Sequence, residues 1–233
     1  MRWLVLASLL IARAAFAQDS RVDEARQLIL DPQRVSEAPA ALRYLARSSK
    51  SLDDQLLILR QATSFDNNVR VEVSRLVVYM NPGPQHLAAV LPACNSWWPE
   101  AHVTCVYVAM RMQGPEADHV LIDAVLKHGP SAGGVAAAAL STRKLERQDA
   151  AQIEAVFDGK PGSSWSLALT SLCASIDADM AARIKDRIDA AGDVDSSLLF
   201  HRLYEDPTRM GECTLSQRDP NPVPARCNAC AKN

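Results

Sequence analysis

Apolar residues along this chain recur at the three- and four-residue spacing of an amphipathic helix. One such stripe is Leu52, Leu56 and Leu59. Several stripes begin at a residue that favours a helix N-terminus, such as Ser51 or Pro84. The pattern predicts an all-α chain of many short helices.

The predicted helix starts fall on two ladders with nearly the same period, which indicates a repeated helix pair. The first helices of the pairs are expected to start at Ser20, Ser51, Pro84, Pro115, Asp149 and Asp177. The second helices are expected to start at Ser36, Asn67, Trp98, Ala132, Ser163 and Val194. A single pair cannot bury both of its apolar faces. We therefore expect about six stacked antiparallel pairs, an α-solenoid with a core that runs through the array.

Two segments fit this pattern less well. The valines between residues 69 and 78 are β-branched and compatible with a strand. Val69, Val73 and Val77 nevertheless share one helical face, so a buried helix is the prediction. Gly133 and Gly134 are expected to make the start of their helix loose or late.

Asp66, Val69 and Arg70 open one of the second helices in the order D-x-x-V-R, which resembles the signature of HEAT repeats. In that family the Asp and Arg help to tie neighbouring repeats together. The resemblance implies a right-handed solenoid of HEAT-like (armadillo-type) repeats over residues 18–206. Tetratricopeptide repeats are the nearest alternative, but their W-x-x-L-G-x-x-Y pattern is absent.

The two ends of the chain differ from the repeats. Residues 1–17 have the pattern of a cleaved secretory signal: Arg2, an apolar run from Trp3 to Ala12, and Ala15-Phe16-Ala17. A membrane anchor is the alternative, but the run is shorter than the ~20 residues that span a bilayer. Residues 207–233 are too rich in proline for a helix. We predict that they form an irregular tail, held on the last repeat by disulfides.

The cysteines favour an oxidising compartment, because all six lie after the predicted signal. The disulfide candidates are Cys94, Cys105, Cys173, Cys213, Cys227 and Cys230. Cys94 and Cys105 flank one turn and are candidates to pair with each other. Cys227-x-x-Cys230 can pair within itself or with Cys213 or Cys173. A redox site would need a βαβ unit, and a zinc site would need further ligands nearby.

Charge and motifs argue against several functions. The net charge of −2 gives no basic excess for nucleic acid. No histidine belongs to a metal or catalytic motif, and His86 and His119 are expected to be solvent-facing residues at matching repeat positions. Neither a phosphate loop nor a nucleophile elbow is present. We predict no cofactor, no metal, no membrane insertion after signal cleavage, and no enzymatic activity.

Trp97 and Trp98 are the first candidates for binding a partner. Adjacent residues on a helix diverge by about 100°, so both side chains cannot point into one core, and exposed Trp is enriched in interaction hot spots. The alternative is that both pack against the loop and the next repeat. Arg70, Arg75 and Tyr79 form a second candidate patch, on the side of a helix expected to be exposed; ordinary solvated residues are the alternative.

These features predict a periplasmic or secreted, non-catalytic module that binds a protein. Its most concrete form is an immunity-type inhibitor of an envelope-targeted toxin, such as a cell-wall hydrolase. The alternative is a structural or assembly scaffold of an envelope complex. An enzyme is the least favoured class.

Overall fold

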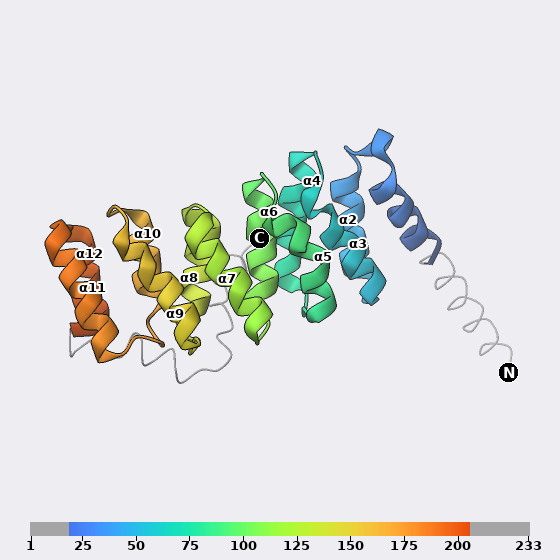
Figure 1. Cartoon of the computed structure of the whole chain (residues 1–233). Coiled ribbons are helices and arrows are strands. Elements are labelled where there is room, and N and C mark those ends of the chain that lie inside the picture. Colours follow the sequence, from blue (N-terminus) through green and yellow to red (C-terminus); the bar gives the residue numbers. More distant parts are fainter. Residues whose placement is uncertain (1–18, 206–233) are drawn as a thin grey trace, which may run out of the picture. The chain divides into compact units, whose positions relative to one another are not determined.

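The computed structural model describes residues 19–205, and over this range the chain is all α, with twelve α-helices and no strand. The chain divides into two compact units, residues 1–112 and 113–233, within each of which the helices stand side by side (Figure 1). No helix in residues 19–205 has the length and apolar character needed to cross a bilayer. The predicted signal and tail, residues 1–17 and 207–233, lie outside the described residues.

Unit 1 begins with helical residues 19–30. Its further elements are η1 (Pro32–Arg34), α2 (Ala38–Ser48), α3 (Leu52–Arg60), η2 (Gln61–Thr63), α4 (Asn67–Leu76), η3 (Val77–Tyr79), α5 (Pro84–Cys94) and α6 (Pro99–Ala109). Helix α3 packs on α5, while α2 packs on α4 and α4 on α6. Like helices of successive pairs therefore lie next to each other, with Leu42, Leu45 and Val73 fully buried among them.

Unit 2 repeats this arrangement. Its elements are α7 (Pro115–Lys127), α8 (Pro130–Leu140), α9 (Arg147–Glu154), η4 (Ala155–Asp158), α10 (Ser163–Ser171), α11 (Ala178–Ala191), α12 (Val194–Phe200) and the π-helical turn η5 (His201–Glu205). Helix α7 packs on α8 and α9, and α10 packs on α8 and α12.

The helix N-caps recur at a nearly constant step, which confirms a repeat-like, all-helical chain. Before the first helices they are Ser51, Gly83, Gly114, Glu146 and Asp177, so the steps are 32, 31, 32 and 31 residues. Before the second helices they are Glu37, Asp66, Trp98, Gly129, Gly162 and Asp193. The valine-rich segment is helical, as predicted, with Val69, Val73 and Val77 buried.

Three predicted helix starts are wrong by two residues. Helix α2 begins at Ala38 rather than Ser36. Helix α9 begins at Arg147 rather than Asp149, and α8 begins at Pro130 rather than Ala132. Gly133 does not delay the start of α8 but lies within it. A Cβ at this position would meet Leu167 Cδ1 of α10 at 3.0 Å, so this glycine lets two neighbouring helices approach closely.

The third residue is buried in the first helices α3, α5, α7, α9 and α11, and in three of them it is polar: Asp54 in α3, His86 in α5 and Asp149 in α9. Each of the three contacts the first helix of the preceding pair. Both oxygens of Asp54 accept bonds from Arg26, at 2.7 and 2.8 Å. His86 Nε2 lies 2.9 Å from Gln55 Oε1. These contacts tie successive pairs together at one repeated position.

The predicted setting of His86 is therefore wrong. This side chain is buried, and the residue that matches it in α7 is Ala117 rather than His119. Its Nδ1 accepts the N–H of Gly83 at 3.0 Å, which closes the first turn of α5. Apolar periodicity does not reveal such a position, because the side chain faces a neighbouring helix pair through hydrogen bonds.

We expect Asp54→Asn to lower the free energy of unfolding at pH 7 by about 2–3 kcal/mol, because it breaks a largely buried ion pair with half-exposed Arg26. The hydrogen bond from Arg26, with those from Ser49 and Ser51, holds the pKa of Asp54 well below its usual range. This stabilisation is therefore present above the unfolded-state pKa of about 3.9 and lost as the pH falls through the lower folded-state pKa. Urea unfolding at pH 7 and pH 3 measures it. The exposed neighbour, in Asp53→Asn, should cost less than about 1 kcal/mol.

Acidification through the ordinary histidine range should destabilise the chain through His86. Burial lowers the pKa of His86 in the folded state, so its neutral form stabilises the fold above the unfolded-state pKa, and this contribution is lost as the pH falls below it. His86→Gln keeps an acceptor for the N–H of Gly83 and should show a smaller loss of stability between pH 7.5 and 5. Equal pH dependence in the two proteins, measured by urea unfolding, would contradict this.

Candidate partner-binding surface

The loops before α4 and α6 have the same hydrogen-bonded structure. In the first, Ser64 Oγ accepts the N–H of Asp66, the N-cap of α4, at 3.3 Å. In the second, Ser96 Oγ accepts the N–H of Trp98, the N-cap of α6, at 3.2 Å. Both serines lie two residues before the cap, with an aromatic residue between. We call residues 64–66 and 95–98 the aromatic loops.

The fourth residue of each helix reaches back to its own aromatic loop. Arg70 of α4 donates from Nη1 to the carbonyls of Ser64 and Phe65, at 2.8 and 3.0 Å. His102 of α6 donates from Nε2 to the carbonyl of Ser96 at 2.6 Å. The backbone of each loop is thus held from both sides of the cap.

Arg70 also joins the two loops to each other. Its guanidinium carbon lies 4.0 Å from the ring centroid of Trp98, and its Nε lies 3.5 Å from Glu100 Oε2. Stacking of this kind suits the flat, weakly hydrated guanidinium. One side chain therefore connects the start of α4 with the start of α6, and Arg70 is only 4% exposed as a result.

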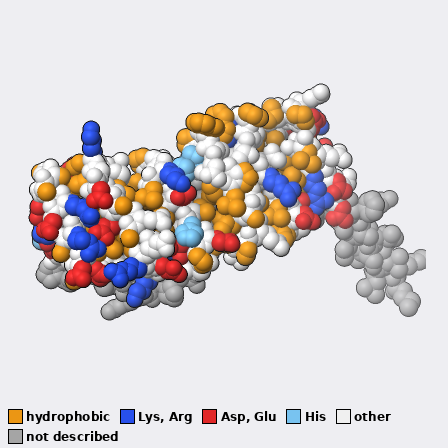
Figure 2. Space-filling model, in the orientation of Figure 1, with side chains coloured by type: hydrophobic (Ala, Val, Ile, Leu, Met, Phe, Trp, Pro, Cys, Tyr) orange, Lys and Arg blue, Asp and Glu red, His pale blue; other side chains and the backbone are white. Residues whose placement is uncertain are grey.

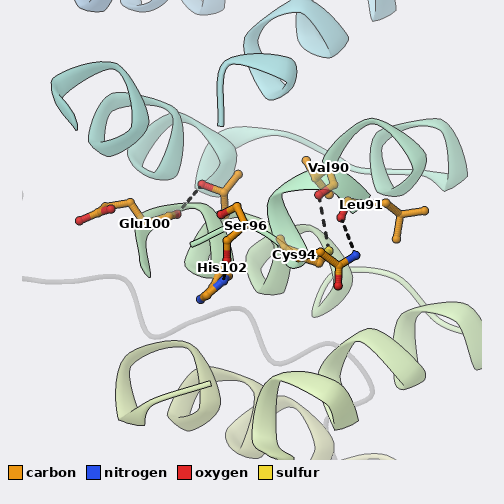
Figure 3. The surroundings of a disulfide bond; sticks show 9 residues. Val90, Leu91, Cys94, Ser96, Glu100 and His102 are labelled. Atoms are coloured by element: carbon orange, nitrogen blue, oxygen red, sulfur yellow. Dashed lines mark hydrogen bonds between the residues drawn. A yellow bond between two sulfur atoms is a disulfide. The ribbon is translucent and has the colours of Figure 1, made fainter. Parts of the chain in front are cut away.

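A disulfide fixes the base of the second loop. Cys94 at the end of α5 is bonded to Cys105 of α6, with 5.4 Å between their Cα atoms. Figure 3 shows its surroundings, with Val90 and Leu91 contributed by α5 and Glu100 and His102 by α6. The disulfide thus closes covalently the short connection, residues 95–98, between the two helices.

The aromatic side chains between serine and cap project into solvent. Trp97 is 95% exposed and Phe65 is 94% exposed, the two highest values among large hydrophobic side chains in residues 19–205. An apolar residue at this position often packs on an apolar fourth residue of the helix, the hydrophobic staple. Here that residue is Arg70 or His102, whose polar groups bind the loop. Neither projecting ring therefore has a local packing role.

The structure separates Trp97 from Trp98. Trp98 is 37% exposed and stacked on Arg70, whereas Trp97 points outward from the same loop. The prediction that Arg70 is exposed is wrong, because its guanidinium donates to loop carbonyls and packs on the ring of Trp98. The rest of that second patch lies further along the chain: exposed Arg75 lies near the end of α4, about 7.5 Å along the helix axis from Arg70, and exposed Tyr79 ends the turn η3 that follows.

Phe65 was not among the residues singled out by sequence reasoning. Its signal lies in comparing the two loops: Ser64-Phe65 precedes the cap of α4, and Ser96-Trp97 precedes the cap of α6, 32 residues later. Arg70 and His102 are offset by the same step. The pattern Ser–aromatic–cap followed by a basic side chain becomes visible only once the caps are placed.

Other candidate chemistry is scattered or already paired. In the described residues no group of three or more His, Cys, Asp or Glu side chains is placed to hold a metal ion. Burial raises the pKa of Tyr204, whose hydroxyl donates to the carbonyl of Leu169. Cys173 is disulfide-bonded, whereas Cys213, Cys227 and Cys230 lie outside the described residues.

The surfaces of the two units differ in character. Figure 2 shows hydrophobic side chains gathered over α4–α6 on the face in view and charged side chains gathered over α11 and α12. The charges of unit 2 are largely matched: Glu154 accepts bonds from Arg183 and Arg187, which lowers its pKa, and Asp158 also pairs with Arg187. In unit 1 the most exposed large hydrophobic side chains of the described residues, Trp97 and Phe65, stand on the aromatic loops.

Comparison with known proteins leaves the function to be argued from the chain itself. No family model and no curated protein matches it. A solved structure described as that of an engineered protein is similar at 14% identity with a TM-score of 0.45, covering 84% of this chain and 97% of the other.

We expect Phe65→Ala and Trp97→Ala each to change the free energy of unfolding by no more than about 0.5 kcal/mol, because neither ring is packed. Trp165 of α10 is the contrasting case, since it is fully buried against Phe157 and bonded to the carbonyl of Val156. Trp165→Ala should cost about 3–5 kcal/mol. A loss above 1.5 kcal/mol for Trp97→Ala in urea unfolding would show that the ring serves the fold instead.

Proposed function

We propose that the chain is an exported, non-catalytic module that binds a protein partner through the aromatic loops of unit 1. One observation supports this proposal: two nearly fully exposed aromatic side chains stand on loops whose backbone is held by side-chain hydrogen bonds. Exposure of a large apolar ring lowers solubility, and neither ring packs on the protein in a way that stabilises the fold. Rigid aromatic anchors are the side chains that dominate protein interfaces.

The architecture we propose is a right-handed solenoid of antiparallel, HEAT-like helix pairs. The D-x-x-V-R residues support it. Asp66 caps α4 by accepting the N–H of Val69 at 3.0 Å, and Arg70 reaches Trp98 and Glu100 of the next pair. Arg70 thus makes the repeat-linking contact that the resemblance implies, while Asp66 caps its own helix. Solenoids expose equivalent loops side by side, which suits them to extended binding surfaces.

Export is supported by disulfide bonding. Disulfides persist in oxidising compartments and are rare in reducing ones, and here Cys94 is bonded to Cys105. We propose that residues 1–17 are a cleaved signal and that the mature protein acts in the periplasm or outside the cell. The most concrete form of the function is an immunity-type inhibitor that blocks a toxin acting on the envelope.

Affinity capture with mass spectrometry tests this function. The mature chain is immobilised and exposed to an envelope extract in its wild-type form and as Trp97→Ala and Tyr79→Ala. Tyr79 is a matched control, since it is 86% exposed but lies away from the aromatic loops. We expect a protein retained by the wild type and by Tyr79→Ala and lost from Trp97→Ala.

The captured proteins also separate the two forms of the function. One stoichiometric toxin indicates an inhibitor, whereas several envelope proteins indicate a scaffold. Identical capture by the wild type and by Trp97→Ala would remove the aromatic loops as the binding surface.

A further inference from the structure

We infer that the two aromatic loops form a single bipartite site for a protein partner with an uncharged, concave apolar surface, and that Arg70 is the residue that positions the two loops together. This inference rests on the proposed function and deepens it, since it states what kind of partner surface fits and which side chain makes one site of two loops.

The shape of the partner surface follows from exposure. A ring that lay flat on the protein would offer one face and be half covered, but Trp97 and Phe65 are 95% and 94% exposed. Such rings are covered on all sides only by pockets. Each aromatic side chain buries about 150–250 Å² when fully covered. Two of them supply the centre of an interface of standard size, which takes about 800 Å² from each partner.

The chemistry of the partner surface follows from which polar groups are already used. Asp66 is the one charged residue within the aromatic loops, and its carboxylate caps α4. The Oγ atoms of Ser64 and Ser96 accept N–H groups of the caps. The loops thus present two rings and no free charge, beside the exposed amides of Asn67, Asn68 and Asn95. A polyanion needs free positive charge, whereas an apolar protein pocket does not.

Arg70 is the residue that makes one binding site of the two loops. Its Nη1 donates to the carbonyls of Ser64 and Phe65, while its guanidinium carbon lies over the ring of Trp98. Movement of either loop against the other breaks one of these contacts. The two loops are therefore held in one fixed position relative to each other. A partner whose pockets take both rings does not have to order the loops when it binds.

A partner-free measurement tests the coupling. The amide protons of Asp66 and Trp98 report on the two loops, because each is bonded to a serine Oγ. In the full mature chain we expect Arg70→Gln to speed hydrogen exchange at both amides by on the order of tenfold. Arg75→Gln, which alters an exposed arginine of the same helix, should change neither. Arg70→Lys should behave like Arg70→Gln, because a lysine keeps the charge but cannot bind both carbonyls and stack. Faster exchange at Asp66 alone would overturn the coupling.

Binding measurements with the captured protein test the partner surface. We expect Phe65→Ala and Trp97→Ala each to weaken its affinity by about thirtyfold or more, with Tyr79→Ala within about twofold. The complex should persist in 1 M NaCl, since its contacts are uncharged. Release by salt would show a charged partner surface, and release by soluble chitotetraose would show a glycan site; either overturns the inference.

The two proposals fail differently. Loss of binding in Trp97→Ala without any effect of Phe65→Ala leaves the proposed function standing and removes the bipartite site. Absence of any captured protein removes both.

Discussion

The structure depends on side chains that cross from one helix pair to the next. Apolar faces drive the pairs together, but apolar contact has no direction and tolerates sliding. Charged hydrogen bonds do not, because they are lost within about an ångström of misplacement. Arg26–Asp54, Arg43–Glu72 and Arg183–Glu154 join residues 28 or 29 positions apart, close to one repeat. Each has a mostly buried carboxylate, which is costly to leave unpaired, so each fixes the register of its two pairs.

The aromatic loops are a consequence of that register. Once α4 and α6 lie side by side in unit 1, their starts lie together, and whatever precedes the two caps is presented on one surface. Arg70 then does two things at once. It belongs to the contacts between pairs, through Glu100 and Trp98, and it anchors the carbonyl of Phe65. The same side chain that helps to hold the repeats together therefore also holds a candidate binding residue in place.

A residue's environment can be predicted from the sequence when it is set by the residue's own helix, and cannot when it is set by contacts with a neighbouring helix pair. From α2 onward, helix starts were predicted within two residues because capping is local. The buried face of α3 was predicted only in part: Leu59 is buried, but Leu52 is exposed and Leu56 is half-buried. Arg70 and His86 were placed wrongly because both are buried by polar contacts: Arg70 mainly with its own loop and the next pair, and His86 with Gln55 of the preceding pair. Phe65 was missed because a single aromatic residue in a polar loop has no periodicity. Only its correspondence to Trp97, one repeat later, distinguishes it.

Departures from the repeat are where a repeated scaffold can acquire a function, because the stacking contacts do not depend on them. In unit 2 the corresponding second helices α8 and α10 are capped by Gly129 and Gly162, preceded by His128 and Pro161. These loops lack the serine and the large apolar ring, yet their helices begin at the same step. The regular spacing of helix starts is thus maintained in loops without an exposed ring, so the rings are not needed for the repeat. The two adjacent loops each expose an aromatic ring and are held by the same kind of hydrogen bonds. A single partner that covers two neighbouring helix pairs would account for this shared feature.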